Sequence, residues 1–156
     1  MSGKIIVTVM AGTAVVFGIA MYYLQVYAFY EELGADAVDL RLTSIGSGQP
    51  EAIDAAGVQA IDASSSPLRF RACFTTDQSR EALSEEFVAY DDPEPLTGPG
   101  WFDCYDASTV GAALENGSAT AYLAQRNIRD GVDRVVAVFD DGRAFVWHQL
   151  NEKYQD

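Results

Sequence analysis

The chain has 156 residues and carries 10 basic against 23 acidic side chains, a formal net charge of −13. All acidic residues follow Tyr30, and from Gln25 onward there are 9 basic and 23 acidic residues, a net of −14. Such a surface repels the phosphates of nucleic acids and anionic lipids, so nucleic-acid binding is excluded and cationic partners are favoured. Acidic character also promotes solubility, so the charge alone does not identify a partner.

The first element is an apolar run over residues 5–24 that contains no charged side chain. As a helix rising about 1.5 Å per residue, it spans about 30 Å, the thickness of a bilayer's hydrocarbon core. Signal peptides have shorter apolar cores of about 7 to 15 residues that end at a small-x-small cleavage site. The nearest such pattern, Ala35-Asp36-Ala37, lies well beyond the run. The sequence therefore predicts an uncleaved anchor over residues 1–33.

Charge and aromatic content around the run predict its orientation. Lys4 precedes the run, whereas Glu31 and Glu32 follow it. The positive-inside rule then places the N-terminus in the cytoplasm and the domain after Leu33 outside, which predicts a single-pass protein of a bacterial inner membrane with a periplasmic domain. An aromatic belt suited to the membrane–water interface marks the exit: Tyr22, Tyr23, Tyr27, Phe29 and Tyr30.

Small residues in the run indicate a helix-packing surface. Ala11, Ala14 and Gly18 fall on one helical stripe, and Thr8 with Gly12 forms a second small-xxx-small pair. Small side chains let a neighbouring membrane helix approach closely, so an integral membrane complex is the expected partner, with contact in the cytoplasmic half. The alternative is the ordinary Gly and Ala content of a single anchor.

Residues 34–156 are expected to form one small acidic domain. Alternating apolar residues predict strands over 38–45 and 68–74. In the second strand Phe70 and Ala72 lie on one face, opposite Arg71 and Cys73. The Gly-, Ala-, Ser- and Asp-rich stretch over 44–66 is expected to be partly loop.

The middle of the domain is predicted to contain short helices and a long loop. A helix is expected over 77–86, followed by an irregular loop over 91–100 that concentrates turn formers. Asp106 or Ser108 is expected to cap a second helix that ends at Asn116-Gly117. A strand is predicted over 119–126.

The clearest pattern is a hairpin over residues 134–150, with Asp141-Gly142 between two apolar runs. A two-residue turn there pairs Phe139 with Ala144 and Val135 with His148. Both faces of the hairpin are largely apolar, which predicts a central position in a mainly antiparallel sheet. With the short helices, the fold class is α+β. This pairing puts Val136, Val138, Phe145 and Trp147 on one face, and Val135, Ala137, Phe139, Ala144, Val146 and His148 on the other.

Cys73 and Cys104 are the two cysteines of the chain. In an oxidising compartment such a pair favours a disulfide, which would also restrain the loop between them. Two inert thiols, or a redox or metal-transfer pair, are the alternatives. The last option normally requires a C-x-x-C spacing or nearby His and Met residues, and the sequence has neither.

We predict no catalytic, cofactor-binding or metal-binding residue. His148 is the single histidine and is expected to be half-buried with satisfied hydrogen bonds. A general base would need a nucleophile and an orienting carboxylate, for which there is no sequence signal. Catalysis by carboxylate pairs leaves no local signature and stays open.

Trp101 and Phe102 place two large aromatics at a loop end beside Cys104. They can fill the core next to a disulfide, or they can be an exposed contact for a protein partner, where Trp and Phe are favoured.

Four segments carry a resemblance that covers most of the chain: MSGKIIV, YYLQVYAFYEEL, WFDCYDAS and FDDGRAFVWHQLNEKY. In these segments the chain resembles a family of uncharacterised single-pass membrane proteins from alphaproteobacteria. The resemblance implies a compartment and a layout, and it implies no activity, because none of the segments is a catalytic motif.

Three functional hypotheses follow. The first is a non-catalytic accessory subunit of a respiratory complex, such as an oxidase, a reductase or their supercomplex, whose acidic domain helps to attract a basic cytochrome c. The second is a membrane-anchored periplasmic assembly factor or envelope adaptor that binds its client transiently. The third is an enzyme whose site leaves no sequence signal.

Overall fold

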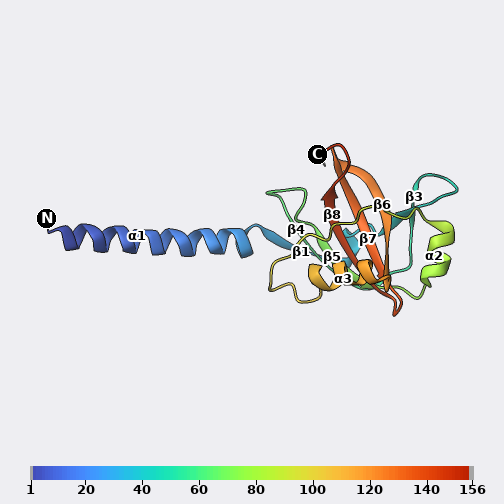
Figure 1. Cartoon of the computed structure of the whole chain (residues 1–156), viewed down its shortest axis with the longest axis horizontal. Helices are drawn as coiled ribbons and strands as arrows, with labels where there is room; N and C mark the ends of the chain where they lie inside the picture. Colours follow the sequence, from blue (N-terminus) through green and yellow to red (C-terminus); the bar gives the residue numbers. More distant parts are fainter. Residues whose placement is uncertain (1, 155–156) are drawn as a thin grey trace. The chain divides into compact units, whose positions relative to one another are not determined.

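The computed structural model describes residues 2–154, which fall into two compact units divided between Tyr30 and Glu31. The first unit is the helix α1, Gly3–Tyr23, which continues through a π-helical turn, η1, over Leu24–Ala28 (Figure 1). The expected anchor region ended at residue 33, but Tyr30–Leu33 form a strand, β1, so helical structure stops earlier.

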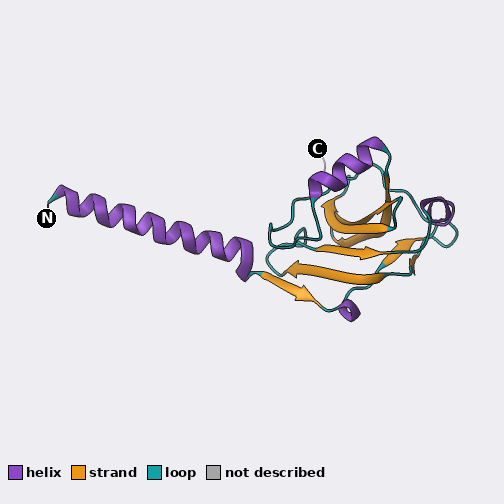
Figure 2. Ribbon diagram, turned by 90° about the horizontal axis from the view of Figure 1, so that it is seen from below, coloured by secondary structure: helices purple, strands orange, loops and turns teal. Residues whose placement is uncertain are grey.

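The second unit is built on a six-stranded sheet in the order β1-β4-β5-β8-β7-β6, and every pairing from β4 to β6 is antiparallel (Figures 1 and 2). With the short helices beside it, this confirms the predicted α+β class. The strands are β4 Ala56–Ala63, β5 Arg71–Thr75, β6 Ala119–Arg129, β7 Val132–Phe139 and β8 Arg143–Leu150.

A smaller two-stranded sheet and three short helices complete the unit. The small sheet pairs β2, Arg41–Thr43, with β3, Pro50–Ala52. The helices are the 3-10 turn η2, Ala35–Ala37, then α2, Arg80–Glu86, and α3, Ala107–Asn116.

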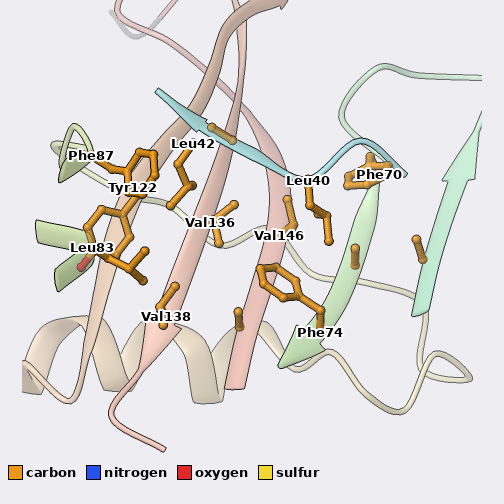
Figure 3. Close-up of a cluster of buried hydrophobic side chains, with 14 residues drawn as sticks. Leu40, Leu42, Phe70, Phe74, Leu83, Phe87, Tyr122, Val136, Val138 and Val146 are labelled. Carbon is orange, nitrogen blue, oxygen red and sulfur yellow. The ribbon is translucent and has the colours of Figure 1, made fainter. Parts of the chain in front are cut away.

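The main sheet buries apolar side chains on both faces. On the first, which we call the core face, Ala72, Val136 and Val146 pack against Leu42 of β2 and Leu83 of α2 (Figure 3). On the second, the disulfide face, lie Cys73, Val135, Ala137, Phe145 and Trp147. Helix α3 contacts β6 and β7 and buries Val110 and Ala113.

Local sequence explains the helix ends. The Asp106 side chain accepts a hydrogen bond from the Ser108 amide and caps α3, and Gly117 ends the helix with a left-handed φ of 80°. This helix is as predicted. Helix α2 starts later than expected because its cap is Ser79, whose side chain accepts from the Ala82 amide.

The hairpin is central as predicted, but its register was wrong by one residue. Val138 pairs with Ala144 and Val135 with Trp147, because three residues, Asp140 to Gly142, form the turn. Gly142 alone in this turn has a positive φ, of 84°, so no two-residue turn with two positive φ angles forms. A slip of one residue exchanges the faces of β8 relative to β7. Phe145 and Trp147 therefore lie on the disulfide face, whereas Ala144, Val146 and His148 lie with Val136 on the core face.

The stretch over 44–66 contains more regular structure than its composition indicated. It forms β3 and the eight-residue strand β4, whose Ala60, Ile61 and Ala63 are buried. Pairing with β5 stabilises this strand, and tertiary context of this kind overrides the weak strand propensity of Ala, Gly and Asp.

Candidate functional site

Helix α1 is long and apolar enough to cross a membrane. Over Gly3–Ala28 its mean hydropathy reaches 2.2, and it is the one such helix among residues 2–154. Length and composition support a membrane span, and an N-terminal signal sequence would meet the same criterion. None of the α1 side chains is buried within the chain.

The predicted helix-packing residues all lie within α1. Beside Gly12 and Gly18 there is no non-local atom within 4 Å of where a Cβ would stand. The Thr8 hydroxyl donates to the Lys4 carbonyl, so it is satisfied within the helix. Ala11, Ala14 and Gly18 share one stripe by their helical spacing.

Three tyrosines of the predicted aromatic belt contact one another. The Tyr23 and Tyr27 rings stack with their centroids 5.9 Å apart, and Tyr22 meets Tyr27 edge to face at 6.3 Å. These contacts bridge the end of α1 and the π-helical turn.

Cys73 and Cys104 form a disulfide, the first of the predicted alternatives. It links β5 to the segment that precedes α3. Phe102 is 8 % exposed and is therefore a core side chain, whereas Trp101 is half-buried and meets it edge to face. Of this aromatic pair, Trp101 is the one that a partner can reach.

The loop over 91–100 is tied to the disulfide face by two buried polar side chains. The Arg71 guanidinium donates to the carbonyls of Leu96, over 2.8 Å, and Thr97, over 3.0 Å. Earlier in the loop, the Glu94 amide donates to the side chain of Gln149. Sequence reasoning missed both roles because the loop carbonyls and amides that bind these side chains carry no sequence pattern.

A second buried hydrogen-bond network lies at the turn between β6 and β7 and is centred on Asp133. The Asp133 carboxylate is fully buried and accepts hydrogen bonds from the Asn127 amide, the Asn151 side chain and the Tyr90 hydroxyl. Burial, with the charge of Asp133, raises the pKa of Tyr90 well above its usual value. The network fixes the chain after β8 and was not predicted.

His148 is buried on the core face opposite Arg134. Its Nε2 accepts a hydrogen bond from Nε of Arg134 over 3.0 Å. Its proton must therefore sit on Nδ1, which donates to the Pro67 carbonyl over 2.7 Å. Burial, with the positive charge of Arg134, lowers the pKa of His148 to about 3. The histidine is thus a neutral acceptor that holds an arginine, and its ring stacks on Phe70 rather than lying beside Phe139.

Arg134 lines an open cavity of about 540 Å³ between β4, β8 and the β6–β7 hairpin. The side chains around it carry both signs of charge, with Arg134 and Arg129 against Asp62 and Asp130, and Ser64 and Ser66 add hydroxyls. Within residues 2–154, no group of three or more His, Cys, Asp or Glu side chains is arranged to hold a metal ion.

Ion pairing within the domain engages most of its basic side chains. Within residues 2–154, five of the 9 basic residues that follow Gln25 pair with acids of the same domain, and Arg71 is buried. These pairs involve six of the 23 acidic residues, so over the described residues the negative excess lies mostly outside ion pairs.

Comparison with known proteins places the chain in a family. Neither the curated proteins nor the solved structures contain a match to this chain. The model of a family of unknown function, DUF6446, matches residues 40–156, which covers most of the acidic domain. The chain therefore belongs to the DUF6446 family.

Proposed function

We propose that this protein is a non-catalytic accessory subunit of a bacterial inner-membrane respiratory complex. In this proposal α1 is a retained anchor that packs against the membrane core of the complex, with the N-terminus in the cytoplasm. The acidic domain lies on the periplasmic face, where it stabilises the assembly and helps to attract a basic cytochrome c.

The observation that carries the proposal is the pairing of one apolar helix with a domain whose basic groups are largely engaged internally. Because the remaining carboxylates are not compensated, the field of the domain is negative. A field of this sign raises the association rate of a cationic partner and is screened by salt.

The direct test is affinity purification of the tagged full-length protein from gently solubilised native membranes, followed by mass spectrometry and absorbance of the eluate. We expect stoichiometric oxidase or reductase subunits with haem absorbance bands. A protein that elutes alone, or with substoichiometric biogenesis factors, would overturn the respiratory proposal and favour an assembly factor or envelope adaptor.

A second test addresses helix packing. Gly18→Leu places a bulky side chain on the small-residue stripe and is expected to reduce co-purification of the complex. Thr13→Leu is the matched control, because it also adds bulk to α1 but its helical position faces away from both the stripe and the Thr8–Gly12 pair. Equal recovery with both variants would argue against packing through this stripe.

A further inference from the structure

We propose that the cavity beside Arg134 binds a small zwitterion that carries one carboxylate and one ammonium group, such as an α-amino acid. This site is independent of the proposed accessory role. Arg134 would hold the carboxylate, and Asp62 would face the ammonium group.

Arg134 is held in place before any ligand arrives. Its guanidinium carbon lies 4.5 Å from the centre of the Phe70 ring, its Nε is bound to His148, and its Nη1 donates to the Asp39 carbonyl over 3.2 Å. Phe70 is buried, and it stacks on His148 as well, with 4.6 Å between ring centroids. A side chain fixed in this way loses little conformational freedom when a ligand binds.

The same contacts leave part of the guanidinium available. Arginine has five N–H donors, of which the His148 and Asp39 contacts use two. Among residues 2–154, the Nη2 atom of Arg134 has no hydrogen-bond acceptor. A planar pair of N–H groups matches the two oxygens of a carboxylate.

The charges around the cavity favour a zwitterion over a simple anion. Asp62 and Arg134 line the same cavity. Burial lowers the pKa of Arg134, and the charges of Asp62 and Asp39 oppose this effect. No ion pair joins Asp62 to Arg134, and the Asp62 carboxylate accepts a hydrogen bond from the Ala63 amide. Arg134 and Arg129 would attract a lone carboxylate ligand, whereas Asp62 and the net charge of −13 would repel it. A zwitterion offers Asp62 an ammonium group and is neutral overall.

The second acidic residue of the cavity, Asp130, is already hydrogen-bonded within the chain. Both oxygens of Asp130 accept hydrogen bonds from Lys153, over 2.6 and 2.7 Å, and Tyr154 donates to one of them. This leaves Asp62 as the carboxylate for a ligand cation. The cavity volume lies within the range of about 300 to 1,000 Å³ that is typical of small-molecule sites, and Pro67 and Ile128 supply apolar lining.

Calorimetric titration and thermal-shift measurements on the detergent-solubilised full-length protein test the proposal. The probes are a panel of L-amino acids, including valine and leucine, with isovalerate, which is valine without its ammonium group, and isoamylamine, which is leucine without its carboxylate. At least one amino acid is expected to bind and raise the melting temperature, and the isovalerate and isoamylamine affinities should be at least about tenfold weaker. Failure of the whole panel, or isovalerate binding as tightly as the best amino acid, overturns the proposal.

Variants locate the site. Asp62→Asn and Arg134→Gln should each weaken binding at least about tenfold, whereas Arg143→Gln, on an exposed pair at the β7–β8 turn and outside the cavity, should leave it unchanged. If Arg134→Gln does not fold, the binding measurement on Asp62→Asn decides the outcome, because Asp62 is half-buried and its replacement should leave the fold intact. Binding that is unchanged in Asp62→Asn places the ligand elsewhere and overturns the proposal.

Discussion

The indole nitrogen of Trp147 donates a hydrogen bond to the side-chain oxygen of Gln149 over 2.9 Å, and the two residues lie on the same face of one strand. The same oxygen accepts from the Glu94 amide over 2.8 Å, while the Gln149 amide group donates to the Asp92 carbonyl. The side chain of Gln149 therefore provides hydrogen-bond partners both for the indole N–H of the buried Trp147 and for backbone groups at the start of the loop over 91–100.

Replacing Gln149 by leucine should destabilise the domain by about 2 to 4 kcal/mol, because it leaves the buried indole N–H of Trp147 and the partly buried backbone amide of Glu94 without an acceptor. Urea unfolding followed by tryptophan fluorescence measures the change. Gln125→Leu is the matched control, since Gln125 is exposed on β6 and should change stability by less than about 0.5 kcal/mol. Equal effects would show that the loop contacts of Gln149 contribute nothing.

The disulfide is expected to stabilise the domain by about 3 to 4 kcal/mol, mainly by restricting the unfolded chain across a separation of 31 residues. The double variant Cys73→Ala/Cys104→Ala should lower the free energy of unfolding by this amount. Treatment of the native protein with a reductant should give a similar loss. A loss below about 1 kcal/mol would contradict a gain that comes from restricting the unfolded chain.

The free energy of unfolding should decrease as the pH is lowered, because His148 titrates differently in the folded and the unfolded chain. Its folded pKa of about 3 lies below the ordinary value of 6.5, so between these values the unfolded chain binds a proton that the folded chain does not. The contribution is complete above pH 6.5 and is lost as the pH falls towards 3. One such proton gives a slope of about 1.4 kcal/mol per pH unit.

Urea unfolding of the native protein and of His148→Gln between neutral pH and about pH 4.5 isolates this slope. The carboxylates titrate in both proteins, so their effect cancels in the comparison. The variant should show the shallower dependence. Parallel curves would contradict a buried neutral imidazole.

Two glycines with left-handed φ angles differ in their surroundings. At Gly142 a Cβ would lie 2.5 Å from the Thr76 carbonyl oxygen, whereas at Gly117 there is open space. Gly117→Ala should cost about 1 to 2 kcal/mol from the backbone conformation alone. Gly142→Ala should cost clearly more, because Thr76 or the turn must also shift. Thermal melts of the two variants check this order, and equal losses would rule out the close approach to Thr76.

Local signals in the sequence predicted the parts of the fold that local chemistry controls. Helix α3 has a capping acid, Asp106, and a terminating glycine, Gly117, so its limits were readable. The Asp141-Gly142 pair located the hairpin tip correctly. It did not define the turn length, because an Asp-Gly pair suits both a two-residue turn and a three-residue turn that needs one positive φ.

The contacts that position the candidate sites are long-range, and a single sequence does not display them. Arg71 binds carbonyls 25 and 26 residues away, and Gln149 binds the backbone more than 50 residues away. Arg71 was expected only on the face opposite Phe70 and Ala72. The pairing of Arg134 with His148 was missed for a different reason, namely the register error of one residue in the hairpin.

The position of β8 has a consequence for how the chain is made. Over residues 2–154, this strand lies between β5 and β7 and joins the β1-β4-β5 half of the main sheet to the β7-β6 half. It follows all its neighbours in the sequence. Until β8 has emerged from the ribosome or a translocation channel, the two halves of the sheet cannot join, and Gln149 cannot bind the loop over 91–100. During this interval the edges of β5 and β7 that β8 will cover have no strand partner.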